Sequence, residues 1–150
     1  MGKKQVTEQN QEEAIKDSEK IEAGLKKEVK VKSSERVAEG RIYVSSSYNN
    51  TIITFTKANG QVIASKSAGA VGFKGTKKST SFAASRVAEA ISNIAKKLGT
   101  EKIEVFIRGI GAGRESAVRT LVTQGLNVVS IKDVTPVPHN GVKPRKVRRV

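Results

Sequence analysis

The stretch TIITFTKANGQVIASKS, Thr51 to Ser67, decides the fold that we expect for this chain. Its first six residues are mostly β-branched or aromatic, a composition typical of a β-strand. Asn59 and Gly60 follow, and both residues accept the positive φ angles of a tight two-residue turn. The seven residues after the turn predict a returning strand. The stretch therefore predicts an antiparallel hairpin.

The flanking residues extend this hairpin on its N-terminal side. Ile42, Val44 and Ser46 alternate with Tyr43 and Ser45, which predicts an earlier strand. On the other side, residues 69–81 are rich in glycine and lysine and predict a loop. Three strands in meander order are therefore expected before the first helix.

Residues 82–98 predict that helix, because apolar residues recur every three or four positions. The apolar stripe comprises Ala83, Val87, Ile91, Ile94 and Leu98. Residues 102–109 predict a strand that is apolar on both faces at its centre, as a strand buried in a parallel sheet would be. Residues 114–125 predict a second helix, and residues 126–137 predict the last strand.

The resulting order, β-β-β-α-β-α-β, predicts an α/β fold. We expect a mixed five-stranded sheet with helices packed on it, in a ribonuclease-H-like topology. Fold alone would suggest a nuclease, but fold does not decide function.

Charge divides the 150 residues into unequal parts. The net charge is +14, yet residues 1–40 contain nine basic and nine acidic residues, so the whole excess lies in residues 41–150. Residues 1–40 have few large apolar side chains and predict a charged, disordered extension. We expect an α/β domain over residues 41–138 and a basic tail over residues 139–150. A positive field of this size attracts polyanions such as nucleic acids.

Several classes of protein are excluded by composition. There is no cysteine and a single histidine, His139, so we expect neither a metal site nor a bound cofactor. No apolar run approaches the roughly 20 residues of a membrane span, and the N-terminus lacks the apolar segment of a signal peptide. An intracellular protein that has no membrane partner is expected.

Catalysis is also disfavoured. Two-metal phosphodiester cleavage requires several carboxylates that converge on one point. From residue 41 on, the acidic residues are Glu89, Glu101, Glu104, Glu115 and Asp133, and their spacing does not bring them together. We therefore expect no catalytic residues.

The stretch RGIGAGRES, Arg108 to Ser116, predicts a glycine loop that runs into a helix. Such loops commonly hold phosphate. The spacing matches neither the dinucleotide fingerprint nor the Walker A motif. A tight turn that needs positive φ is the simpler reading, but Arg108, Arg114 and Arg119 surround it and favour the phosphate of a polynucleotide.

Two further basic segments support nucleic-acid binding. Lys74, Lys77 and Lys78 lie in the glycine-rich loop together with Phe73, which either stacks on a base or pins the loop to the core. The tail carries five cations that would order on RNA, namely Lys143, Arg145, Lys146, Arg148 and Arg149. We call these five residues the tail cations.

From about Gly40 to Val150 the chain closely resembles the family of small-subunit ribosomal protein eleven, in its bacterial-type form. The resemblance rests on SSYNNTIITFTKANGQVIASKSAGAVGFKGTKKSTSFAA, on the RGIGAGRES loop, and above all on DVTPVPHNGVKPRKVRRV. Two departures concern prolines: this chain has Ile110 and Ala112 in the glycine loop, and Ser81 before the helix, where the family often has proline.

The resemblance implies a structural protein of the ribosomal platform. It would bind small-subunit ribosomal RNA, help to form the cleft for messenger leader sequences, and neighbour small-subunit proteins seven and eighteen in the cytoplasm. It implies no homo-oligomer. Asn140-Gly141 matches a site that the family can convert to isoaspartate.

The RNA-binding residues carried over or inferred are Asn49, Asn50, Phe73, Lys74, Lys77, Lys78, Arg108, Gly109, Gly111, Gly113, Arg114, His139, Asn140 and the tail cations. The alternative function is a basic architectural protein that coats nucleic acid non-specifically.

Overall fold

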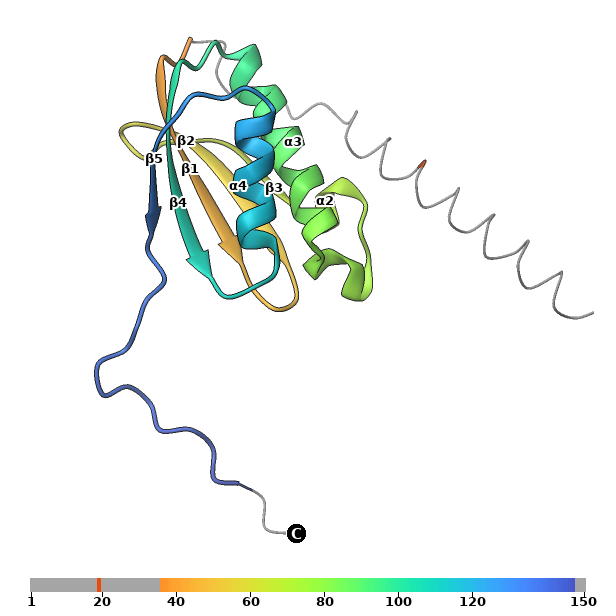
Figure 1. Cartoon of the computed structure of the whole chain (residues 1–150), viewed down its shortest axis with the longest axis vertical. Helices are drawn as coiled ribbons and strands as arrows, with labels where there is room; N and C mark the ends of the chain where they lie inside the picture. Colours follow the sequence, from red (N-terminus) through yellow and green to blue (C-terminus); the bar gives the residue numbers. More distant parts are fainter. Residues whose placement is uncertain (1–18, 20–35, 148–150) are drawn as a thin grey trace, which may run out of the picture.

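The structure is a computed structural model that describes Glu19 and residues 36–147 (Figure 1). Its elements follow the predicted order, with two short helices added. They are β1 (Glu39–Ser46), β2 (Thr51–Lys57), β3 (Val62–Ser67), α2 (Ala68–Val71), the 3-10 helix η1 (Gly75–Ser79), α3 (Ser81–Lys97), β4 (Lys102–Gly109), α4 (Gly113–Thr123) and β5 (Val128–Asp133).

The five strands form one mixed sheet in the order β3-β2-β1-β4-β5. The pairs β1–β2 and β2–β3 are antiparallel, whereas β1–β4 and β4–β5 are parallel. Helix α3 makes the crossover from β3 to β4, and α4 makes the crossover from β4 to β5. The predicted α/β class and ribonuclease-H-like strand order are confirmed.

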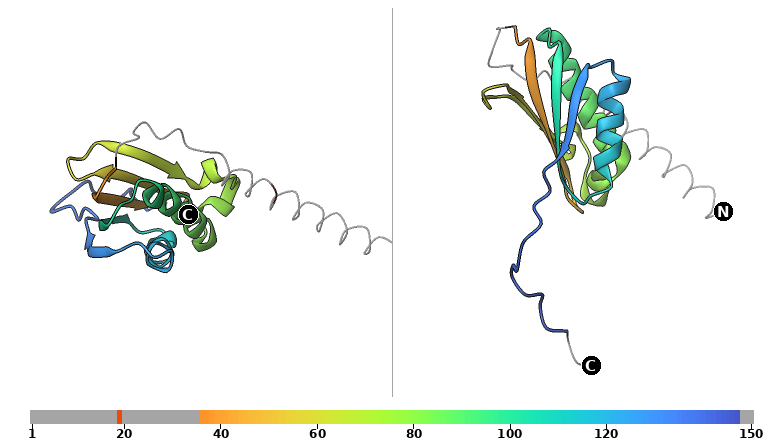
Figure 2. Two further views of the ribbon diagram at one scale, coloured as in Figure 1. Left: turned by 90° about the horizontal axis from the view of Figure 1, so that it is seen from above. Right: turned by 60° about the vertical axis from the view of Figure 1, so that its left-hand side comes forward.

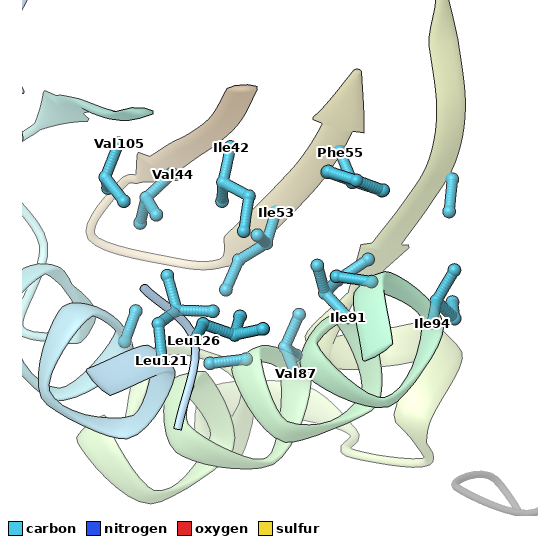
Figure 3. Packing of buried hydrophobic residues seen from close by; sticks show 14 of the residues in the cluster. Ile42, Val44, Ile53, Phe55, Val87, Ile91, Ile94, Val105, Leu121 and Leu126 are labelled. Carbon is cyan, nitrogen blue, oxygen red and sulfur yellow. The ribbon is translucent and has the colours of Figure 1, made fainter. Parts of the chain in front are cut away.

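The helices cover one face of the sheet, so the domain has two layers (Figure 2). The apolar stripe predicted for α3 is buried along its whole length, from Ala83 to Leu98. Figure 3 shows Ile42, Val44, Ile53 and Phe55 of the sheet directed toward this helix and toward Leu121 of α4. The alternation of apolar side chains in β1 and β2 places them in this single core.

The opposite face of the sheet is open, which differs from the expectation for β4. Ile103 and Val105 face the helices and are buried, but Phe106 lies on the open face beside Tyr43 of β1. The two rings stack with centroids 5.0 Å apart, and the ammonium of Lys132 lies 5.5 Å from the Phe106 centroid. The apolar centre of β4 therefore reflects a local aromatic pair and not a second covering layer.

Three predicted boundaries also differ. The loop over residues 69–81 contains α2 and η1, because the Ser67 hydroxyl accepts a hydrogen bond from the Ala70 N–H and starts a helical turn. The last strand ends at Asp133, before the prolines. The packed domain begins before residue 41, because Val37 is buried and its N–H donates to the Leu98 carbonyl.

The disorder predicted for residues 1–40 falls almost entirely on positions 1–18 and 20–35, which lie outside the described residues. Within the described part of the chain, no helix has both the length and the apolar character needed to cross a bilayer.

Candidate nucleic-acid interface

The topology gathers the predicted RNA-binding segments at one end of the domain. Strands β1, β3, β4 and β5 all run in the same direction, so their carboxyl ends meet at one edge of the sheet (Figure 1). Binding loops of open α/β sheets commonly follow such ends. We call this the carboxyl edge, and it comprises residues 47–50, 68–80, 108–115 and 133–147.

Charge at the carboxyl edge is strongly positive. These four segments contain eight basic residues and two acidic ones, Glu115 and Asp133. The other acidic residues of the sheet lie away from this edge in ion pairs: Glu104 contacts Arg41 at 3.1 Å and Lys132 at 3.7 Å, and Glu39 contacts Lys102 at 3.5 Å. Among the described residues, no three carboxylate or histidine side chains gather as metal ligands would.

The glycine loop is pressed against the end of β1. Gly109 has a φ of 100°, and a Cβ added there would lie 2.1 Å from the Ser46 carbonyl oxygen. A Cβ on Gly111 would lie 2.3 Å from the Ser47 carbonyl oxygen, while the Gly111 N–H donates to the Ser46 carbonyl at 3.0 Å. Side chains do not fit at either position, so the simpler reading of a tight, closely packed turn holds for both glycines.

The third glycine sets the distance between α4 and the rest of the core. A Cβ on Gly113 would lie 2.4 Å from Thr51 Oγ1 and 2.8 Å from Ala84 Cβ. Gly113 is the first residue of α4 and is buried. The amides of Gly109 and Gly111 already donate within the domain, to Thr135 Oγ1 and to the Ser46 carbonyl. These two amides are therefore not free to bind a ligand, and the flanking arginines are the groups of this loop that remain for one.

These arginines point in different ways. Arg108 and Arg119 are exposed. Arg114 is instead turned inward: its Nη1 donates to the Gly109 carbonyl and to Thr135 Oγ1, and its Nη2 donates to Asp133 Oδ2. Sequence spacing predicts that Arg114 lies at the start of a helix, but it does not predict this set of acceptors.

Asp133 carries the acceptor carboxylate at the end of β5. Its pKa is lowered from 3.8 to about 2, first by the hydrogen bond from the Thr135 hydroxyl, then by the Thr135 N–H and by Arg114. Hydrogen bonds to the charged form stabilise it. Asp133 is therefore an anion throughout the neutral pH range.

Phe73 anchors the loop over residues 69–81, which carries Lys74, Lys77 and Lys78 and which we call the lysine loop. The Phe73 side chain is 6 % exposed and meets the ring of Phe82 edge to face, with centroids 5.9 Å apart. Of the two alternatives for Phe73, the structure supports core packing over stacking on RNA. The inclusion of Phe73 among the RNA-binding residues is corrected accordingly. Lys74 and Lys77 are exposed beside it, and Lys78 is half-buried.

The two asparagines of the turn between β1 and β2 differ in exposure and in hydrogen bonding. Asn50 shapes the turn, because its Oδ1 accepts from the Thr51 N–H at 3.0 Å and its carbonyl accepts from the Ser47 N–H at 2.9 Å. Asn49 is exposed, whereas Asn50 is half-buried. Asn49 is therefore the more accessible of the two.

The described part of the tail leaves β5 and runs away from the domain (Figures 1 and 2). His139, Asn140, Lys143, Arg145 and Lys146 are all exposed, and Asn140 has a φ of 53°. Arg148 and Arg149 lie outside the described residues.

Exposed Tyr48 and Ile110 at the carboxyl edge, and Phe82 just beyond it, were not predicted as site residues. Tyr48 is 75 % exposed, Ile110 61 % and Phe82 54 %. The Arg86 guanidinium lies 5.3 Å from the Phe82 centroid and is held by Glu89 at 2.9 Å. A signal was present for Phe82, because it falls outside the apolar stripe of α3, and for Tyr48, because it stands alone in a polar turn.

These features define a class of protein: a basic α/β domain with cations and aromatic rings gathered at one edge, built to hold nucleic acid and lacking converging carboxylates among its described residues. The family model of ribosomal protein S11 matches residues 40–149. The small ribosomal subunit protein uS11 of Treponema pallidum subsp. pallidum is 50 % identical over 121 residues, which cover 81 % of this chain and 96 % of that protein. The uS11 protein of Treponema pallidum, strain Nichols, matches to the same extent.

The chain belongs to the ribosomal protein S11 family. It is therefore a ribosomal protein of the small subunit, with ribosomal RNA and other ribosomal proteins as partners, and it is a structural component and not an enzyme.

Proposed function

We propose that the carboxyl edge is the surface with which this chain binds small-subunit ribosomal RNA on the platform of the subunit. The observation that carries the proposal is the gathering of the lysine loop, the glycine loop and residues 133–138, the root of the tail, at one edge of the sheet. Basic side chains on different loops can then meet the phosphates of one folded RNA.

Within this surface, the basic side chains are the phosphate contacts. Lys74, Lys77, Lys78, Arg108 and the tail cations supply the charge, while Asn49, His139 and Asn140 supply polar groups. The glycines at 109, 111 and 113 allow the glycine loop to pack closely against the end of β1. Asn50 shapes the adjacent turn between β1 and β2. Exposed Phe82 and Tyr48 offer rings for unpaired bases, a common mode of RNA recognition.

The wider assignment follows from the family resemblance. We infer that the chain helps to shape the cleft for messenger leader sequences, that small-subunit proteins seven and eighteen are its neighbours, and that it acts in cytoplasmic ribosomes. The alternative, a non-specific coat on nucleic acid, requires many equivalent sites. The net positive charge of the carboxyl edge, with eight basic and two acidic residues, favours a single oriented site.

The test compares two pairs of lysines at opposite ends of α3. Lys74→Gln with Lys78→Gln removes two charges from the carboxyl edge, and Lys96→Gln with Lys97→Gln removes two from the last turn of α3 at the other end. Binding to a platform fragment of small-subunit ribosomal RNA is measured over a range of salt. Each phosphate contact contributes about 0.7 to 0.9 to the slope of log affinity against log salt.

We expect the first pair to make the slope shallower by roughly 1.5 units and the second pair to leave it unchanged. Equal losses for both pairs would support the non-specific coat. A stoichiometry of one protein per fragment, retained in competition with bulk RNA, is expected for the oriented site.

A further inference from the structure

The root of the basic tail is tied to two other elements of the domain. Arg114, in the first turn of α4, donates to the Gly109 carbonyl at the end of β4 and to Asp133 Oδ2 at the end of β5. Its Nη1 also reaches Thr135 Oγ1 at 3.3 Å. One guanidinium therefore joins β4, α4 and β5 at the point where the tail begins.

The Thr135 hydroxyl completes this cluster. It donates to Asp133 Oδ1 at 2.6 Å and accepts from the Gly109 N–H at 3.1 Å and from Arg114. A hydroxyl has one donor and two acceptor positions, so all three are used. A charged carboxylate and a guanidinium at the ends of such a chain strengthen it.

The backbone between these residues is also held. The Val134 N–H donates to the Ile107 carbonyl at 2.8 Å, and the Thr135 N–H donates to Asp133 Oδ1 at 2.9 Å. Every residue from 133 to 135 is thus bonded to the end of β4, to α4 or to its neighbour.

Two prolines limit the flexibility of the backbone between Thr135 and the tail. Pro136 and Pro138 have restricted φ angles, and each also restricts the residue before it to extended backbone. Few free torsions remain between Thr135 and His139. The direction in which the tail leaves the domain is therefore set mainly at its root.

We propose that Arg114 and Asp133, joined through Thr135, form a clamp that aims the basic tail, and that Arg114 aids RNA binding by positioning the tail and not by touching phosphate. The inference rests on the proposed RNA-binding function and assigns a role within that surface. Fixing the root raises the effective concentration of the tail cations near an RNA already held by the loops.

The decisive substitution is Asp133→Asn. It keeps the shape of the side chain, releases Arg114 from its ion pair and removes a negative charge from a surface that binds a polyanion. Electrostatics alone therefore predicts tighter RNA binding. The clamp predicts weaker binding, by roughly fivefold, because the tail samples a wider volume.

A second background isolates the tail. The same substitution is made in the full-length chain with all five tail cations changed to Gln, and affinity for the platform fragment is measured for the four proteins. With no charge left to aim, Asp133→Asn is expected to leave affinity unchanged or to raise it slightly. Thr135→Val, which breaks the cluster without changing charge, is expected to follow the same pattern and serves if Asp133→Asn does not fold.

The outcomes separate the clamp from the function on which it rests. Tighter binding by Asp133→Asn with the natural tail, or an equal loss with and without tail charges, overturns the clamp while RNA binding stands. Failure of the unaltered chain to bind the fragment overturns the proposed function instead.

Discussion

At the scale of single residues, Thr135 controls the ionisation of Asp133. The pKa of Asp133 is about 2 in the folded chain against 3.8 for an unperturbed carboxyl, so the carboxylate stabilises the fold fully above pH 3.8 and loses this effect as pH falls toward 2. We expect Thr135→Val to raise the pKa toward 3.8, because the hydroxyl is the largest cause of the shift, and Thr135→Ser to keep it low. An NMR titration of the Asp133 carboxyl carbon measures this. A Thr135→Val pKa still near 2 would contradict it.

At the scale of elements, the start of α4 depends on a glycine that has ordinary helical geometry. A Cβ on Gly113 would meet Thr51 Oγ1 at 2.4 Å and Ala84 Cβ at 2.8 Å, so Gly113→Ala must push α4 away from β2 and α3. We expect the free energy of unfolding to fall by about 1 to 3 kcal/mol, as for other overpacked cores. Gly69→Ala in α2 is the matched control, since its nearest atom lies 3.8 Å away and the change is expected within about 0.5 kcal/mol of zero. Urea denaturation tests both, and equal stabilities would show that Gly113 does not serve packing.

At the scale of the whole molecule, the residues that carry the charge of the tail are separate from the residues that form the core. The core lies between the sheet and its helices, whereas the described tail residues 139–147 are exposed. Changing the five tail cations to Gln should therefore leave the melting temperature unchanged. If most of these cations contact phosphate, the slope of log affinity against log salt should become shallower by roughly three to four units, since each lost contact removes about 0.7 to 0.9. An unchanged slope in the salt titration would move RNA binding off the tail.

Local pattern was enough to predict most of the fold. The alternation in β1 and the stripe from Ala83 to Leu98 depend on neighbours close in sequence, and both appear in the structure as predicted. The hairpin also forms at Asn59-Gly60, but its turn is longer than two residues and only Gly60 has a positive φ there. The same reasoning located the basic loops. It was wrong for the buried second face of β4, because periodicity reports which side chains are apolar but not whether a layer covers them.

The amino-acid order alone predicted the α/β class, the order of the elements along the chain, the excess positive charge and the segments that carry it. Folding in three dimensions decided which groups those segments meet. Phe73 turned toward Phe82 and the core, Phe82 remained at the surface, and Arg114 found Gly109, Asp133 and Thr135. The physical reason is separation along the chain: Arg114 and Asp133 are 19 residues apart, and they meet because the ends of β4 and β5 and the start of α4 lie at one edge of the parallel part of the sheet.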